Sequence, residues 1–485
     1  MDTKVSKDVK NFEWKGAKIL PLIVVCCFFL VLWFYTPSTK DAVVLSEQGW
    51  KLLVIFLSTI LSFIIAPLPM GAMAVIAATM CVLTGTIPLN QVLASFGSNI
   101  VWLIVSAFLL ARGFIKSGLG ARIAFYFIKF LGKSTLGLAY GLTLTELIFA
   151  PGTPSNTARG GGIVNPIIKG LSLEYNSLPE DNTQRKISSY LYKLLYQINV
   201  ITSAMFLTAT AGNPLVVDIL AMHGIILSWG TWALACIVPG CVNLVVVPLL
   251  LYIVYPPELK YTPEAPEFAR KNLEKLGPMD FDQIVMLLVF ILLLFLWVFG
   301  DFLKIDATTA GLAGLSLLLL TGVLNWKDIQ KEEDAWNTFV WMSVLIMLSA
   351  KLAQYGVTKW FGHYILSLLS GIGWVYGLVF MGLLYYYAHY FFASMTAHIS
   401  ALYATFFTAS LTLGAPAMLT ALFLAVSSSL SAGLTYYGTG SGPVYFGSKC
   451  VSAKEWFLYG FIVSVVNIII WVVVGCVWWK VLGYW

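Results

Sequence analysis

A short polar segment, Pro154-Ser155-Asn156-Thr157-Ala158-Arg159, interrupts a long apolar stretch of the sequence. Two prolines and four glycines lie between positions 150 and 162, and they cannot continue a helix without freeing backbone N–H and C=O groups. We therefore expect the chain to turn here and a new helix to start near Thr157. The free N–H groups of that helix, with the side chains of Ser155, Asn156 and Thr157, would then face an anion. The simpler alternative is a kinked helix whose Ser and Thr side chains cap their own backbone.

The segment Ser394-Met395-Thr396-Ala397-His398 repeats this pattern later in the chain. Because it contains neither Pro nor Gly, only its relation to the first segment predicts a turn. Ser394 and Thr396 keep the hydroxyl groups, whereas Met395 replaces the amide of Asn156. A constant separation between matching residues indicates a duplicated half. Five identities fall 239 residues apart: Trp102 and Trp341, Gly132 and Gly371, Ser155 and Ser394, Thr157 and Thr396, and Ala158 and Ala397.

A second polar interruption follows each of these segments. Gly212, Asn213 and Pro214 lie within the apolar stretch 193–222, and Gly442 and Pro443 lie within the stretch 415–446. Both interruptions predict discontinuous helices that close the same cavity and contribute to substrate binding. A pair of ordinary proline kinks is the alternative.

Arg159 and His398 occupy matching positions beside the two segments. A charge inside a membrane is costly, so each of them needs a reason to be there. One interpretation is that they supply positive charge close to two carboxylates. The alternatives are a structural ion pair between Arg159 and Glu146 and a neutral, packed His398.

The composition shows what kind of elements must position these residues. Of 485 residues, 59% are hydrophobic and only 11% are charged, and the mean hydropathy is +0.84. Soluble domains carry about 25% charged residues, so lipid must be the solvent here. This excludes a cytosolic enzyme, a nucleic-acid-binding protein and a disordered chain. The net charge of +6 is spread between apolar segments, and we read it as a marker of membrane orientation.

We predict an all-α integral membrane protein with about eleven transmembrane helices and two re-entrant hairpins. The expected organisation is a cytoplasmic tail with a first helix in 1–46, a first repeat in 47–255, a cytoplasmic linker in 256–280 and a second repeat in 281–485. The hairpins are expected at about 134–170 and 372–413. Most of the 29 Lys and Arg residues then fall on one side, which predicts a cytoplasmic N-terminus. An odd number of spans in each half makes the repeat inverted.

With these motifs, the chain resembles the divalent anion:sodium symporters, also called INDY-type dicarboxylate transporters, and in particular their bacterial citrate/succinate and 2-oxoglutarate/malate antiporters. The resemblance rests on Pro154-Ser155-Asn156-Thr157-Ala158, on Ser394-Met395-Thr396-Ala397-His398 and on Ala388-His389-Tyr390-Phe391-Phe392-Ala393-Ser394. It implies that Ser155, Asn156, Thr157, Ser394 and Thr396 lie at two hairpin tips and bind substrate carboxylates. It also implies a homodimer in which a scaffold domain guides a transport domain that moves as an elevator.

Met395 departs from the family pattern, in which an Asn helps to form a sodium site. The resemblance therefore leads us to expect that Arg159 and His398 replace sodium ions. The expected function is sodium-independent exchange of succinate, malate, fumarate, 2-oxoglutarate or citrate across the cell membrane. The alternatives are a sodium-coupled symporter, a channel and a membrane-embedded enzyme. The sequence contains no metal-ligand cluster and no nucleophile beside a base, so we expect neither a cofactor nor enzymatic activity.

Overall fold

A computed structural model describes residues 16–35, 45–357, 360 and 373–485. The predicted N-terminal tail at 1–15, the loop at 36–44 and the expected start of the second hairpin at 372 lie outside the described residues. The described part of the chain is helical, and its extended backbone forms only one isolated bridge, between Ser134 and Tyr261. The first helices are α1 (Ile19–Phe34), α2 (Glu47–Ile65), α3 (Met70–Leu83), α4 (Leu89–Ala94), η1 (Ser95–Gly97), α5 (Asn99–Ser117) and α6 (Leu119–Leu131).

The first predicted hairpin consists of two helical arms with a break between them. The side chain of Ser134 caps the first arm, and the Ala150-Pro151-Gly152 turn ends it, as the prolines and glycines predicted. The apolar stretch that follows is also broken, because a 3-10 turn separates α9 from α10. The elements are α7 (Thr135–Phe149), η2 (Ala150–Gly152), η3 (Ala158–Val164), α8 (Asn165–Glu174), α9 (Ser188–Met205), η4 (Leu207–Ala209), α10 (Gly212–Ala221) and α11 (Trp229–Val254).

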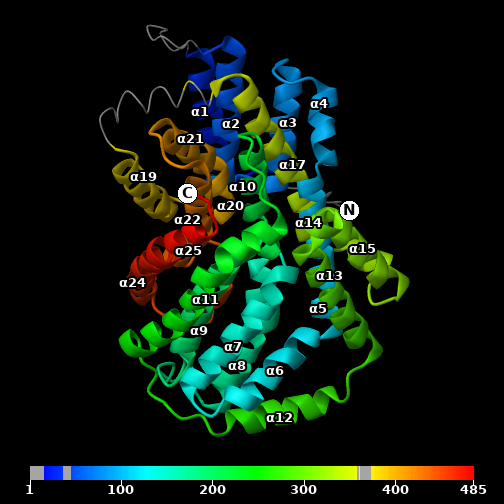
Figure 1. Ribbon diagram of the computed structural model, residues 1–485, viewed down its shortest axis with the longest axis vertical. Coiled ribbons are helices and arrows are strands. Elements are labelled where there is room, and N and C mark those ends of the chain that lie inside the picture. The colour runs from blue at the N-terminus through cyan, green and yellow to red at the C-terminus, as the bar shows by residue number, and fades with distance from the viewer. Residues whose placement is uncertain (1–15, 36–44, 358–359, 361–372) are drawn as a thin grey trace, which may run out of the picture.

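The linker between the halves contains one helix, α12 (Ala265–Leu276), which the prolines of this region did not predict. In Figure 1, α12 lies across the end of the molecule opposite to α1–α4. The buried guanidinium of Arg122, on α6, holds the end of this linker by donating to the carbonyl oxygens of Leu276, Gly277 and Pro278.

The second part of the chain has a comparable order of elements, while the repeat itself stays a prediction. A long helix is followed by a hairpin of two arms, and a broken helix comes next. The elements are α13 (Phe281–Val298), α14 (Gly300–Leu303), α15 (Ala307–Leu320), α16 (Trp326–Gln330), α17 (Glu333–Gln354), α19 (Trp374–Ala388), η5 (His389–Phe391), α20 (Met395–His398), η6 (Ile399–Tyr403), α21 (Ala404–Thr412), α22 (Ala417–Leu430), η7 (Ser431–Leu434), α23 (Ser441–Phe446), α24 (Ala453–Ile470), η8 (Trp471–Gly475) and α25 (Cys476–Val481).

Seven helical segments of the described residues are long and apolar enough to cross a membrane. They include α2, α5, α11, α13 and α17, together with the two segments that contain α22 and α24. Shorter apolar helices, among them α1, α3 and α15, fall on further stretches where spans were expected. The chain is therefore a multi-pass helical membrane protein, and the count of eleven spans stays a prediction.

Two groups of helices meet around the region of the hairpin tips. Helix α9 is completely buried and packs against α7, α11 and α22. Helix α17 packs against α3 and α5, and the side-chain oxygen of Asn337 accepts a hydrogen bond from the N–H of Gly71 at 3.0 Å. The tips thus lie between a group centred on α9 and a wall that includes α17.

Candidate functional site

Both predicted tips line one cavity, although they lie more than two hundred residues apart in the chain. Its volume is about 180 Å³, and most of its wall is polar. Ser155, Asn156 and Thr157 come from the first tip, and Ser394 and Thr396 come from the second. The complete wall consists of Phe108, Pro154, Ser155, Asn156, Thr157, Thr210, Ala211, Asp334, Thr338, Trp341, Ser394, Met395, Thr396, Thr439 and Gly440.

The two serines play the same local part at the two tips. Each precedes a helical turn, and its Oγ accepts a hydrogen bond from the backbone N–H three residues later. The distance is 3.1 Å from Ala158 to Ser155 and 3.4 Å from Ala397 to Ser394. The second tip therefore breaks without Pro or Gly, because Ser394 has extended backbone and caps the short helix α20.

The middle residues of the tips differ in what they bind. The amide nitrogen of Asn156 donates to the hydroxyl of Thr439 at 2.5 Å, which ties the first tip to the broken helix of the second half. Met395 has no group that makes such a bond, and its side chain is buried at the cavity wall. The cavity is therefore lined by hydroxyl groups on both sides but by an amide only on one.

The two polar interruptions that follow the tips also line the cavity, but through residues other than the predicted ones. Thr210 and Ala211 line it in the first half, and Thr439 and Gly440 line it in the second. The predicted residues Gly212, Asn213, Pro214, Gly442 and Pro443 lie directly after them, in the first turns of α10 and α23.

Asn213 has a structural partner set that accounts for its position. Its amide nitrogen donates to the carbonyl oxygens of Ser203 at 2.7 Å and Phe206 at 2.9 Å, at the end of α9. Helix α9 ends here, and the carbonyl of Phe206 also accepts from the N–H of Ala209 at 3.0 Å, so Asn213 adds a buried donor to the backbone of the break. Asn213 therefore stabilises the break beside the cavity.

Arg159 is fully buried and does not line the cavity. Its Nε donates to Glu146 at 2.9 Å, and its Nη2 donates to the hydroxyl of Ser203 at 2.9 Å. Its Nη1 donates to the carbonyl oxygens of Ala209, at 2.6 Å, and Thr153. The guanidinium therefore fixes the backbone of the first tip and of the break after α9, and the ion pair with Glu146 balances its charge.

His398 is also buried outside the cavity wall. Its Nε2 lies 2.9 Å from the carbonyl oxygen of Tyr385, and its ring meets that of His389 with 4.9 Å between centroids. His389 Nε2 lies 3.0 Å from the carbonyl oxygen of Gly438. Since a carbonyl oxygen only accepts, both rings are assigned the tautomer protonated at Nε2. The two histidines join the second tip to the second break.

Asn199, on α9, also joins the two halves, and the sequence did not reveal it. Its amide nitrogen donates to Glu146 at 2.5 Å and to the backbone oxygen of Asn156 at 3.1 Å. Its amide oxygen accepts from the hydroxyl of Ser441 at 2.8 Å. The amide is fully satisfied and fully buried. An Asn within an apolar helix was the available signal, but only the fold gives its partners.

A third side of the cavity comes from α17, which the sequence also did not predict. Asp334, Thr338 and Trp341 line the cavity, and their spacing of four and then three residues puts them on one helix face. The sequence marks Trp341 as the repeat partner of Trp102 and does not place it at a site. Asp334 is exposed, because it lies in the first turn of α17.

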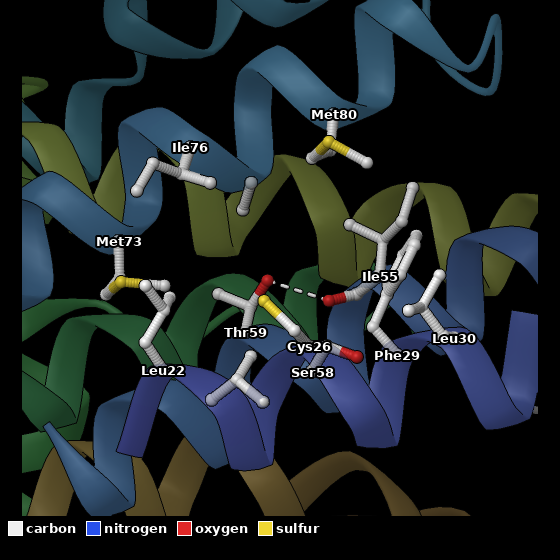
Figure 2. Close-up of a pocket in the computed structure, with 12 residues that line it drawn as sticks. Leu22, Cys26, Phe29, Leu30, Ile55, Ser58, Thr59, Met73, Ile76 and Met80 are labelled. Atoms are coloured by element: carbon white, nitrogen blue, oxygen red, sulfur yellow. Dashed lines mark hydrogen bonds between the residues drawn. The ribbon is translucent and has the colours of Figure 1, made fainter. Parts of the chain in front are cut away.

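A different cavity, of about 260 Å³, lies between α1, α2 and α3 (Figure 2). Its walls are almost entirely apolar, and the hydroxyl of Thr59 donates to the carbonyl of Ile55 within its own helix. An anion would find few hydrogen-bond donors there. No group of three His, Cys, Asp or Glu side chains in the described residues could hold a metal ion.

The fold is that of a helical membrane protein with a polar cavity, and comparison with known families makes the class of protein specific. A family profile described as "Sodium:sulfate symporter transmembrane region" matches residues 16–485. The chain therefore belongs to this family of transporters, which confirms the resemblance to divalent anion:sodium symporters. It is a transporter and not an enzyme.

Three relatives have sequences that align with almost the whole chain. YflS of Bacillus subtilis (strain 168), which carries a provisional name as a malate transporter, is 46% identical over 97% of this chain and 98% of its own length. Dicarboxylate transporter 1, chloroplastic, of Spinacia oleracea is 45% identical over 97% of this chain and 83% of its own. Inner membrane protein YbhI of Escherichia coli (strain K12) is 37% identical over 91% of this chain and 94% of its own.

A solved structure shares the fold at low sequence identity. Neisseria gonorrhoeae MtrF, presented as one of a class of antimetabolite efflux pumps, superimposes with a TM-score of 0.56 at 12% identity. The match covers 94% of each chain. At this identity the likeness concerns the fold alone.

Proposed function

We propose that this chain exchanges one dicarboxylate for another across the cell membrane, without sodium. The substrates would be succinate, malate, fumarate or 2-oxoglutarate, and also citrate where the cavity admits a third carboxylate. The proposal rests on one observation: hydroxyl-bearing residues of both tips line the same cavity. A ligand with a carboxylate at each end fits two anion-binding tips. The names of the relatives in Bacillus and spinach support this substrate class.

The binding chemistry follows from the side chains at the tips. We propose that Ser155, Asn156 and Thr157 bind one carboxylate and that Ser394 and Thr396 bind the other. Hydroxyl and amide groups donate to carboxylate oxygens, and such charge-assisted hydrogen bonds are stronger than neutral ones. Gly212, Asn213, Pro214, Gly442 and Pro443 would support these contacts by holding the broken helices that carry Thr210 and Thr439.

Independence from sodium is supported by what surrounds the first tip. Carbonyl oxygens are the ligands that hard cations prefer, and here Arg159 already donates to those of Thr153 and Ala209. We propose that Arg159 in this way takes the place of a bound cation, and that His398 does the same near the second tip. Met395 removes an amide oxygen from that second tip. Arg159 stays buried beside the first tip whether or not substrate is bound, so we propose that no ion has to bind there with the substrate and that the chain works as an exchanger.

The remaining parts of the proposal concern movement and assembly. We propose inverted repeats, with a transport domain that carries both tips past a scaffold domain containing α17. The elevator movement, the homodimer and the cytoplasmic N-terminus are further parts of the same proposal. The position of the cavity between the two tips and the α17 wall supports the division into two domains.

Counterflow in proteoliposomes tests the function. Vesicles loaded with succinate should accumulate labelled succinate or malate equally in sodium-free and sodium-containing buffer. Empty vesicles should accumulate neither. Unlabelled fumarate, 2-oxoglutarate and citrate, added as competitors, would then rank the substrates.

The second candidate is a sodium-coupled dicarboxylate symporter, which the family name favours. In that case empty vesicles would take up labelled succinate when an inward sodium gradient is present. That result would contradict the exchanger. A channel would be recognised by flux that neither saturates nor depends on substrate inside the vesicle.

A further inference from the structure

We propose that Asp334 is a specificity-determining residue that weakens the binding of dianionic substrate and so promotes its release. Asp334 lines the cavity from the α17 wall, together with Thr338 and Trp341. This inference rests on the proposed transport of dicarboxylates. In this proposal the tips bind the substrate and the α17 wall limits how tightly it is bound.

The charge distribution around the cavity leads to this assignment. Among the described residues that line the cavity, Asp334 is the only one with an ionisable side chain. The other polar side chains of the wall carry hydroxyls, one amide and the indole N–H of Trp341, none of which is ionisable. A dianion held between the tips and α17 therefore meets neutral donors on one side and a fixed negative charge on the other.

Two basic groups of this region are paired with other acids, and a third, Arg112 on α5, attracts Glu332 and Asp328 without lining the cavity. The guanidinium of Arg159 is paired with Glu146 and does not line the cavity. Lys116, on α5, is paired with Asp328 at 2.7 Å. The nearest acids along the chain, Glu332 and Glu333, add negative charge at the start of α17.

A fixed charge on the α17 wall acts on binding in a predictable way. Asn337 anchors α17 to α3 through Gly71, so the wall keeps its position relative to α3. Like charges repel, and the repulsion is moderate because Asp334 is exposed to water and salt. An exchanger needs this effect, since a substrate bound too tightly would leave slowly and limit turnover.

The opposite effect is also chemically reasonable and is separated by the same experiment. Asp334 would increase affinity if it held a cation that accompanies the substrate. Neutralising it would then weaken binding instead of strengthening it. The sign of the change therefore decides between repulsion and cation recruitment.

The test compares Asp334→Asn with Glu333→Gln. Glu333 is the neighbouring acid, is exposed and does not line the cavity, so its variant removes the same charge from the same helix end. The dissociation constant of labelled succinate is measured on each purified protein at two ionic strengths, and counterflow is measured in parallel. Asp334→Asn should bind succinate about three- to thirtyfold more tightly at low salt. The difference should shrink at high salt, which a purely structural effect would not do.

Glu333→Gln should behave like the original protein in both assays. Unchanged or weaker binding by Asp334→Asn, or a gain shared by Glu333→Gln, would overturn the inference. Failure of the proposed function looks different, because the original protein would then show no succinate counterflow at all. The conservative variant Asp334→Glu keeps the charge, so it should bind succinate as weakly as the original protein does.

Discussion

The ion pair between Arg159 and Glu146 holds the first tip, and breaking it should be costly for both stability and transport. Arg159→Met removes the guanidinium and keeps much of the side-chain volume. Among the described side chains, it leaves Asn199 as the donor to the buried Glu146 carboxylate. It also leaves the buried carbonyl oxygens of Thr153 and Ala209 without this donor.

The magnitude follows from the loss of a buried partner. Removing one member of a buried ion pair costs about 3–5 kcal/mol, because the remaining charge is uncompensated. Arg159→Met should lie at the upper end of this range, since two backbone acceptors also lose their donor. Glu146→Leu should cost a similar amount. The double variant buries no charge, so it should cost clearly less than the sum, with a coupling energy of about 3 kcal/mol.

The assay is denaturant unfolding of the purified protein and its variants in detergent, with counterflow measured alongside. The double variant should regain stability but not transport, because the carbonyl oxygens at the tip still lack their donor. The exposed pair of Arg270 and Glu267, on α12, provides a control cycle that should give no measurable coupling. Additive effects of Arg159→Met and Glu146→Leu would refute this reasoning.

The remaining predictions concern single sites. Asn199→Leu should reduce counterflow at least about tenfold while the protein stays folded by size exclusion, because both halves lose a shared partner; near-normal counterflow would contradict this. Gly440→Ala should impair counterflow, because its added Cβ would lie 2.3 Å from the hydroxyl of Thr157 in the first tip. Gly161→Ala is the control, because the nearest atom to its Cβ lies at 3.4 Å. Equal effects of the two substitutions would contradict the contact. Lys116 lowers the pKa of Asp328 by donating a hydrogen bond to its carboxylate. Asp328→Asn should therefore lower the free energy of unfolding by up to about 1 kcal/mol at pH 7. This difference should fade as the pH falls below about 3.9 and be lost once the pH passes the lowered pKa of Asp328. Urea unfolding of both proteins at neutral and acidic pH measures it.

Local sequence signals predicted where the helices break. Prolines and glycines at 151–162 predicted the first tip, and the structure has a turn and a new helix there. At the second tip these signals were missing, and the constant offset that matches Ser394 to Ser155 was the indication. It succeeded because Ser394 provides the same helix cap.

The composition of the wall could be predicted only in part. The signals at Gly212 and Pro443 mark the helix starts, while the residues before them, Thr210 and Thr439, line the cavity. A break in a pattern locates a turn but does not tell which side chains point into a cavity. Asp334 gave no local signal, because its place depends on the packing of α17 against α5.

A structure of the protein with succinate, determined in a lipid nanodisc by electron cryo-microscopy, would test the central claim most directly. The account predicts one carboxylate beside Ser155, Asn156 and Thr157 and the other beside Ser394 and Thr396. It also predicts that the guanidinium of Arg159 still contacts Thr153 and that no sodium ion occupies that place. Succinate bound elsewhere at saturating concentration, or contacting only one tip, would contradict the account.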